Sequence, residues 1–223
     1  MAEDTALKKV VVFVCAVLIV VFSGQQLAGP LLSTEMLDHL RTEYSDEAYR
    51  RGLTINKLLV ELKNQDVQKQ LLEVNRFFNQ FEYVEDHIHW GEQDYWATPS
   101  EFLGTQKGDC EDFVIAKYFA LRTLGVPDER LYLTYVKALR QNVAHMVLSY
   151  FPTPASIPQI LDNYNPMILS ASKRTDLLPV YSFNAKSLFL TNASAGLGKS
   201  LPTNKIKNSK WEKLLADIQK AKQ

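Results

Sequence analysis

Cysteine is scarce in this sequence, whose 223 residues contain only Cys15 and Cys110. Because Cys15 falls in an apolar N-terminal segment, Cys110 is the only thiol of the globular part, and no disulfide can form within that part. An excess of charge is also lacking, since 25 Lys and Arg balance 25 Asp and Glu. This balance gives no support for nucleic-acid binding, which usually goes with a basic surface. The sequence shows no Walker loop, Gly-rich dinucleotide motif, zinc-ribbon pair or internal repeat.

A long apolar run is missing as well. Lys8 and Lys9 precede thirteen apolar residues, 10–22, whereas a membrane helix needs about 20. A positive stretch before a short apolar core is typical of a secretory signal. The cleavage pattern is poor, because a cut after Ala28 would place Gln26 three positions before it. We therefore expect residues 1–30 to be a signal peptide or an uncleaved signal anchor, and the following domain to be exported.

The remaining chain has the composition of a globular protein, with 46% apolar and 22% charged residues. Apolar periodicity and turn residues predict a helix-rich first half, with helices at 36–42, 54–63, 66–81, 98–104 and 108–124, and a loop before residue 52. Strands are predicted at 131–136, 145–151, 159–162, 178–183 and 188–190, and Arg174 and Asp176 are expected in a surface turn. Residues 191–209 are predicted to be a linker, and the apolar spacing after it predicts an amphipathic helix that packs on its own domain. The domains expected are 1–30, the folded domain 31–192, and linker plus helix 193–223.

Cys110 has a local setting that could make it reactive. Gly108 forms a turn and Asp109 can cap a helix, so Cys110 lies in the first helical turn. A thiol there faces unpaired N–H groups and the positive end of the helix dipole, which favours the thiolate. A free cysteine is, however, more often a small buried core residue. Cys110 alone leaves both interpretations open.

Two residues in the strand half match the partners that a catalytic thiol needs. His145 opens a strand, and Asp162 ends the next one. Adjacent antiparallel strands would bring them close, with the Cys110 helix packed across the sheet. Cysteine proteases use a thiolate, an imidazole that holds the proton, and a carboxylate or amide that orients the imidazole. Each residue could also be a satisfied strand-end histidine or a turn-forming carboxylate, but the three occur in the required chain order.

Three carboxylates, Asp109, Glu111 and Asp112, surround Cys110 in sequence. Left bare, they would raise the pKa of the thiol and oppose the helix dipole. They could simply stabilise the helix N-terminus, but that accounts poorly for three around one thiol. A cation would neutralise them, and oxygen ligands in an irregular arrangement favour calcium over magnesium.

The histidines and tryptophans before Cys110 have less specific interpretations. His87 and His89 could suggest zinc together with Cys110, but the globular part offers only this one cysteine and no second ligand pair, which disfavours a zinc site. Trp90 and Trp96 are expected in the core, or on the floor of a substrate cleft.

Several segments together resemble one family. They are EFL at 101–103, GDCEDF at 108–113, AKYFALR at 116–122, LTYV at 133–136, AHMVL at 144–148, LDN at 161–163 and RTDLLPVYSFN at 174–184. The sequence resembles the bacterial transglutaminase-like cysteine proteinases over residues 32–189. The resemblance implies an α+β, papain-like/transglutaminase-core fold, with a helical N-terminal half packed on an antiparallel sheet. It further implies Cys110 as nucleophile, His145 as base and Asp162 as the residue that orients it, with calcium held by Asp109, Glu111 and Asp112.

The same resemblance implies a biological role. Members of the family are periplasmic enzymes that cut a large biofilm adhesin in its N-terminal region, after paired alanines, and so release it from the cell. An inner-membrane receptor that responds to cyclic di-GMP holds them inactive, and we expect such a partner near Trp90 and Trp96. A transglutaminase-type acyl transferase, a silent binding module on the same fold and a peptidoglycan-cleaving peptidase remain alternatives.

Overall fold

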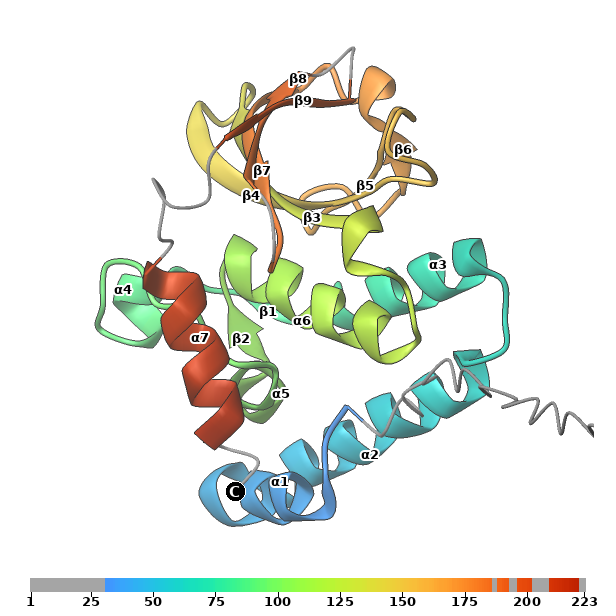
Figure 1. Ribbon diagram of the computed structural model, residues 1–223. Helices are drawn as coiled ribbons and strands as arrows, with labels where there is room; N and C mark the ends of the chain where they lie inside the picture. The colour runs from blue at the N-terminus through green and yellow to red at the C-terminus, as the bar shows by residue number, and fades with distance from the viewer. Residues whose placement is uncertain (1–30, 186–187, 193–195, 202–208, 221–223) are drawn as a thin grey trace, which may run out of the picture.

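The structure is a computed structural model and describes residues 31–185, 188–192, 196–201 and 209–220 (Figure 1). Within these ranges no helix is long and apolar enough to cross a membrane. The residues predicted to form the signal peptide or anchor, 1–30, lie outside the described part.

Helices make up the first half of the described chain, as predicted. They are α1 (Thr34–His39), which continues as a π-helical turn (Leu40–Tyr44), α2 (Asp46–Leu62), α3 (Val67–Phe78), α4 (Asp86–His89), α5 (Pro99–Thr105) and α6 (Cys110–Thr123). The loop predicted before residue 52 is wrong, because α2 begins at Asp46. The Ser45 hydroxyl caps α2 by accepting the N–H of Ala48. Asp66 caps α3 in the same way, as expected.

Strands of the second half form one antiparallel sheet in the order β6-β5-β4-β3-β7-β8-β9. Their bounds are β3 (Leu131–Ala138), β4 (Val143–Tyr150), β5 (Gln159–Leu161), β6 (Leu169–Ser170), β7 (Leu177–Phe183), β8 (Leu188–Asn192) and β9 (Gly196–Leu201). The predicted α+β fold is therefore confirmed. A short parallel pair, β1 (Glu82–Tyr83) with β2 (Lys107–Gly108), leads into α6.

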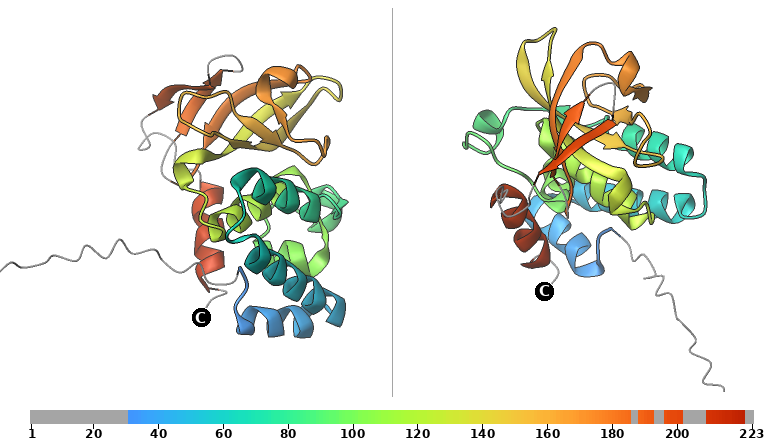
Figure 2. Two further views of the ribbon diagram at one scale, coloured as in Figure 1. Left: turned by 90° about the vertical axis from the view of Figure 1, so that its right-hand side faces the viewer. Right: turned by 45° about the horizontal axis from the view of Figure 1, so that its top comes forward.

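The sheet lies on one side of the molecule and the helices on the other, with α6 between them (Figures 1 and 2). Helix α6 packs on β3 and β4 and also against α3 and α5. Because it is covered on both sides, most of its side chains are buried, including polar ones. This packing brings the N-terminal end of α6, with Cys110, close to β4.

The C-terminal part differs from the prediction in one respect. Strands β8 and β9 pair with each other, and β9 lies inside the segment 191–209 that was predicted to be a linker. The sheet therefore continues beyond residue 192, and β9 forms its edge next to β8 among the described residues. Helix α7 (Ser209–Lys220) follows, and its Trp211 is buried against Tyr118 and Phe119 of α6. The prediction that this helix packs on its own domain is confirmed.

Candidate active site

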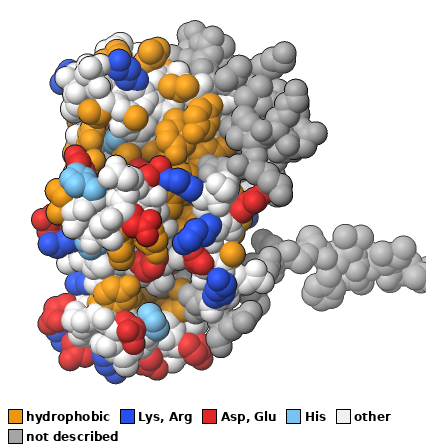
Figure 3. Space-filling view, turned by 90° about the vertical axis from the view of Figure 1, so that its left-hand side faces the viewer, with side chains coloured by type: hydrophobic (Ala, Val, Ile, Leu, Met, Phe, Trp, Pro, Cys, Tyr) orange, Lys and Arg blue, Asp and Glu red, His pale blue; other side chains and the backbone are white. Residues whose placement is uncertain are grey.

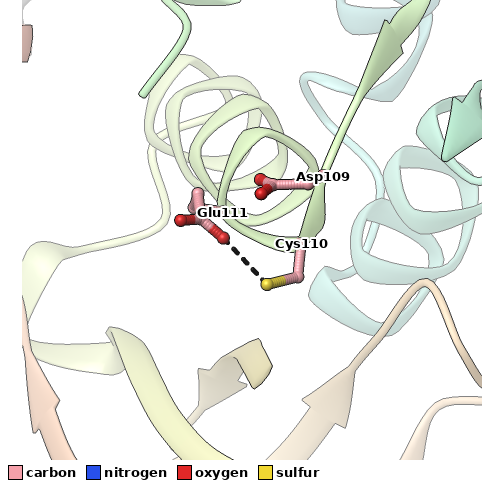
Figure 4. Close-up of side chains that lie close together, drawn as sticks. All are labelled: Asp109, Cys110 and Glu111. Atoms are coloured by element: carbon pink, nitrogen blue, oxygen red, sulfur yellow. Dashed lines mark hydrogen bonds between the residues drawn. The ribbon is translucent and has the colours of Figure 1, made fainter. Parts of the chain in front are cut away.

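Cys110 is the first residue of α6, as predicted, and is nearly buried, with 9% of its surface exposed. Its thiol donates a hydrogen bond to Glu111 Oε2, with 2.8 Å between sulfur and oxygen (Figure 4). Asp112 completes a capping box with Asp109 and also accepts the N–H of Ala97 at 2.8 Å. Both oxygens of Asp112 therefore bind backbone N–H groups, which fixes the turn that carries Cys110.

His145 and Asp162 lie together, as the sequence predicts. The His145 Nε2 atom is 2.8 Å from Asp162 Oδ1, and both side chains are buried. The other ring nitrogen, Nδ1, has no hydrogen-bond partner among the described residues. The backbone N–H of Met146, the next residue in β4, interacts with the Cys110 thiol and favours its ionised form. The sulfur therefore lies beside the strand position that carries His145.

Two further residues hold this pair, and sequence analysis missed the role of both. Tyr164 stacks on the His145 ring with 4.0 Å between centroids and a 7° interplanar angle. Arg174 is buried and donates from Nη2 to Asp162 Oδ2 at 2.7 Å. The prediction that Arg174 lies in a surface turn is therefore wrong, because its guanidinium turns inward to the buried carboxylate while it also pairs with Asp176.

Burial of Asp162 would by itself raise its pKa. The hydrogen bonds and charges of His145 and Arg174 outweigh this, so the pKa of Asp162 lies below its usual value. Asp162 is therefore a carboxylate at neutral pH. It can accept a hydrogen bond from the Nε2–H group of His145 both in the neutral tautomer that carries this hydrogen and in the imidazolium.

Five carboxylates gather beside Cys110, of which the sequence identified three. Asp86 and Asp94 join Asp109, Glu111 and Asp112 in overlapping groups whose oxygen atoms lie within 4.8 Å of one another. Asp86 begins α4, and Asp94 lies in the loop that follows. Because they precede Cys110 by 24 and 16 positions in the sequence, only the folding of the 86–98 segment against α6 shows that they belong to this site.

These five carboxylates repel one another unless a cation neutralises them. Burial, and then the neighbouring carboxylates, raise the pKa of Asp109 to about 10. Burial and Glu111 similarly raise the pKa of Asp86 to about 6, and that of Cys110 well above its usual value. One oxygen of Asp86 and one of Asp109 are buried without a hydrogen-bond partner among the described residues. This donor set fits a hard divalent cation.

The histidines and tryptophans that precede Cys110 in the sequence make contacts of their own, away from the three residues of the candidate catalytic site. His87 Nδ1 is 3.2 Å from Glu85 Oε2, and His89 packs on Trp90 with 4.3 Å between ring centroids. Trp96 is buried and stacks on Phe183, in agreement with the core alternative. Trp90 is only partly buried.

A thiol at a helix start, facing a strand that presents an imidazole bound to a carboxylate, defines the class of papain-like cysteine proteinases with a transglutaminase core. The chain belongs to the bacterial transglutaminase-like cysteine proteinases, whose family model matches residues 43–178.

Solved structures of one relative agree with this assignment. Calcium-bound LapG of Legionella pneumophila is 43% identical to this chain, with a TM-score of 0.71 over 84% of this chain and 99% of that one. EGTA-treated LapG of the same organism has the same identity and a TM-score of 0.72, over 85% of this chain and all of that one. No curated protein sequence matches the chain.

Proposed function

We propose that this protein is a calcium-dependent cysteine endopeptidase, exported to the periplasm, that cuts the N-terminal region of a large cell-surface adhesin. The observation that carries the catalytic part is the arrangement of His145. Its Nε2 is bound to Asp162, and its Nδ1, on the strand that faces the Cys110 sulfur, has no hydrogen-bond partner in the part of the chain that the structure describes. This is the arrangement in which an imidazole can take a proton from a thiol.

This geometry supports the following roles for the three residues. His145 Nδ1 takes the thiol proton, and Cys110 Sγ attacks the scissile carbonyl to form a thioester. His145 then gives the proton to the leaving amine, and a water molecule hydrolyses the thioester with His145 as base. Asp162 holds the ring and stabilises the imidazolium, while Arg174 keeps Asp162 ionised.

Calcium is assigned to this carboxylate cluster because Asp86, Glu111 and Asp112 are buried, the five groups repel one another, and one oxygen each of Asp86 and Asp109 has no hydrogen-bond partner in the described part of the chain. Asp86, Asp94, Asp109 and Glu111 are the candidate ligands, and Asp112 holds the turn beside them through its backbone bonds. Bound there, a divalent cation would neutralise the group and engage Glu111, which otherwise accepts the Cys110 thiol. The calcium-bound structure of LapG supports this assignment.

The adhesin substrate and the receptor rest on the family resemblance. Trp90, with the 69% exposed Ile88 next to it on α4, offers an apolar contact for the proposed cyclic-di-GMP-responsive receptor. Figure 3 shows hydrophobic side chains exposed among charged ones on the face of the molecule seen from the side of α4 and α7. Since Trp96 is buried, Trp90 is the member of the tryptophan pair that a partner can reach.

The proposal is tested by adding the purified protein to the N-terminal segment of a large adhesin encoded in the same genome. Cleavage after paired alanines is expected in calcium, not in EGTA and not in magnesium, and new N-termini are read by mass spectrometry. Cys110→Ala serves as the inactive control. Incorporation of a fluorescent amine in place of hydrolysis would support the acyl-transferase alternative, and release of cell-wall fragments the peptidoglycan alternative; either would overturn the adhesin proposal.

The receptor is tested separately with Trp90→Glu. This variant should lose binding to the periplasmic domain of the receptor while cleavage of the adhesin segment persists. Unchanged receptor binding would show that the partner uses another face.

A further inference from the structure

Lys117 is a fully buried lysine on α6, the helix that begins with Cys110. Its ammonium group donates to Asn79 Oδ1 at 2.6 Å. Burial lowers the pKa of Lys117 to about 7, and the Asp162 carboxylate is the charge that opposes this. A buried ammonium is costly unless partners compensate it, so its presence behind the active site calls for a reason beyond packing.

Asn79 links Lys117 to the loop that carries Asp162. It ends α3 and donates from Nδ2 to the backbone carbonyl of Asp162 at 2.8 Å. An ammonium group has donors only, so Lys117 requires the amide oxygen of Asn79 on its own side. The amide nitrogen must then face the Asp162 carbonyl, and the orientation of Asn79 is fixed by chemistry on both sides.

A second asparagine holds the other end of the same loop. Asn75 precedes Asn79 by four positions, so both lie on one face of α3. Its Nδ2 donates to the carbonyl of Pro166 at 2.9 Å, and its side chain is buried. Helix α3 therefore binds the loop 162–166 at both ends.

Between these two ends lie the groups that touch His145. Asp162 Oδ1 binds the ring nitrogen Nε2 and also accepts the N–H of Tyr164. The Tyr164 ring covers the face of the imidazole. The position of this loop thus determines the direction in which the free Nδ1 points.

We propose that Asn75, Asn79 and Lys117 are positioning residues, which hold the loop 162–166 so that His145 presents Nδ1 to the Cys110 thiol. This inference rests on the proposed function, because it concerns the same active site. None of the three needs to touch substrate. Lys117 and Asn79 act as one unit, since the ammonium group of Lys117 donates to the same amide that binds the Asp162 carbonyl.

The expected effect is on the chemical step. A displacement of about 1 Å in a catalytic group can cost on the order of 100-fold in rate. Loss of the hold on the loop should therefore lower kcat by roughly 10- to 100-fold and leave KM within about 2-fold, because the substrate contacts are unchanged.

Three variants test the link: Asn79→Leu, Lys117→Met, and the two combined, assayed on the adhesin segment in saturating calcium. If both residues act through one bond, the combined variant should be no slower than the slower single variant. If the fold-loss of kcat in the combined variant equals the product of the two single fold-losses, the claim that the residues form one unit is overturned.

Asn79→Asp separates positioning from stability. It keeps an acceptor for Lys117 and adds an ion pair, but it removes the donor to the Asp162 carbonyl. We expect a lower kcat with a thermal stability close to that of the wild type, because the new ion pair with Lys117 offsets the loss of the donor to the Asp162 carbonyl. Asn56→Leu is the matched control, because Asn56 also bridges to backbone groups, the N–H and carbonyl of Leu32, away from the catalytic residues. Equal kcat in Asn79→Asp and the wild type would overturn the proposal.

A second readout does not depend on the substrate. The rate of Cys110 alkylation by iodoacetamide, measured from pH 5 to 9 in calcium, reports the thiolate that His145 supports. The rate near neutral pH should fall in Asn79→Asp and Lys117→Met but not in Asn56→Leu. If the wild type shows a neutral-pH thiolate but no proteolysis, the proposed function fails and the positioning role stands. If cleavage and alkylation are both unaffected in the variants, the positioning role fails alone.

Discussion

Replacement of Lys117 by methionine should make the protein more stable and less active at the same time. The reason is that the wild-type fold holds an ammonium group in its interior. Met has a similar length and no charge, so it removes the cost of burial and also removes the bond to Asn79.

The size of the effect follows from the pKa. Lowering the pKa of Lys117 from 10.5 to about 7 corresponds to about 5 kcal/mol of lost stability wherever the group is protonated in both states. The native state binds this proton less tightly than the unfolded state, so the wild-type free energy of unfolding rises with pH between about 7 and 10, by about 1.4 kcal/mol per pH unit from this group. Loss of a partner for Asn79 Oδ1 offsets roughly 1–3 kcal/mol. The variant should thus gain roughly 1–4 kcal/mol at pH 7.

The assay is urea or thermal unfolding of wild type and variant in saturating calcium at pH 7, 8 and 9. Other titrating groups are common to both proteins, so their contributions cancel in the difference. That difference should shrink by roughly 2–3 kcal/mol from pH 7 to 9, or roughly 5–10 °C in Tm for a chain of this size. Lys137, an exposed lysine of β3, gives the control Lys137→Met, whose pH dependence should match the wild type. Parallel wild-type and Lys117→Met curves would refute the reasoning.

Four further predictions concern the active site. Cys110→Ala should abolish cleavage with little change in Tm, because it removes one sulfur atom and its hydrogen bond to Glu111; residual cleavage would contradict its role. Asp162→Asn should retain a trace of activity, since an amide oxygen can still orient His145 but stabilises the imidazolium less, and a single-turnover assay measures it. Asp86→Asn should raise the calcium concentration needed for half-maximal activity and weaken calcium binding measured by calorimetry; unchanged binding would place the ion elsewhere. Asp112→Ala should lower Tm by several degrees, because the backbone N–H groups of Ala97 and Asp109 lose their acceptor.

The start of α6 could be read from the sequence because its signals are local. A turn glycine, a capping aspartate and apolar residues at helical spacing determine where the helix begins, and therefore that Cys110 lies in its first turn. His145 and Asp162 were identified because alternation and turn residues mark strand ends, and the register of β4 with β5 then brings them close. The carboxylates next to Cys110 in sequence were found for the same reason.

The rest of the site depends on packing between segments that are far apart in the chain. Asp86 and Asp94 join the carboxylates only because the segment after α4 folds against α6. Arg174 follows turn-like residues, but it turns inward because a buried carboxylate needs a partner. Strand β9 was mistaken for a linker because Gly, Ser and Asn are typical of loops, and only pairing with β8 orders it.

Lys117 shows most directly what the sequence could not predict. In sequence it is one more charged residue on a helix with an apolar face, and such residues are normally exposed. The sequence alone determined that α6 is a helix with a cysteine in its first turn. Only the tertiary structure decided that the sheet covers one side of α6 and other helices the opposite side, so that this lysine lies inside the protein. There the amide of Asn79 connects it to the loop 162–166, which carries Asp162.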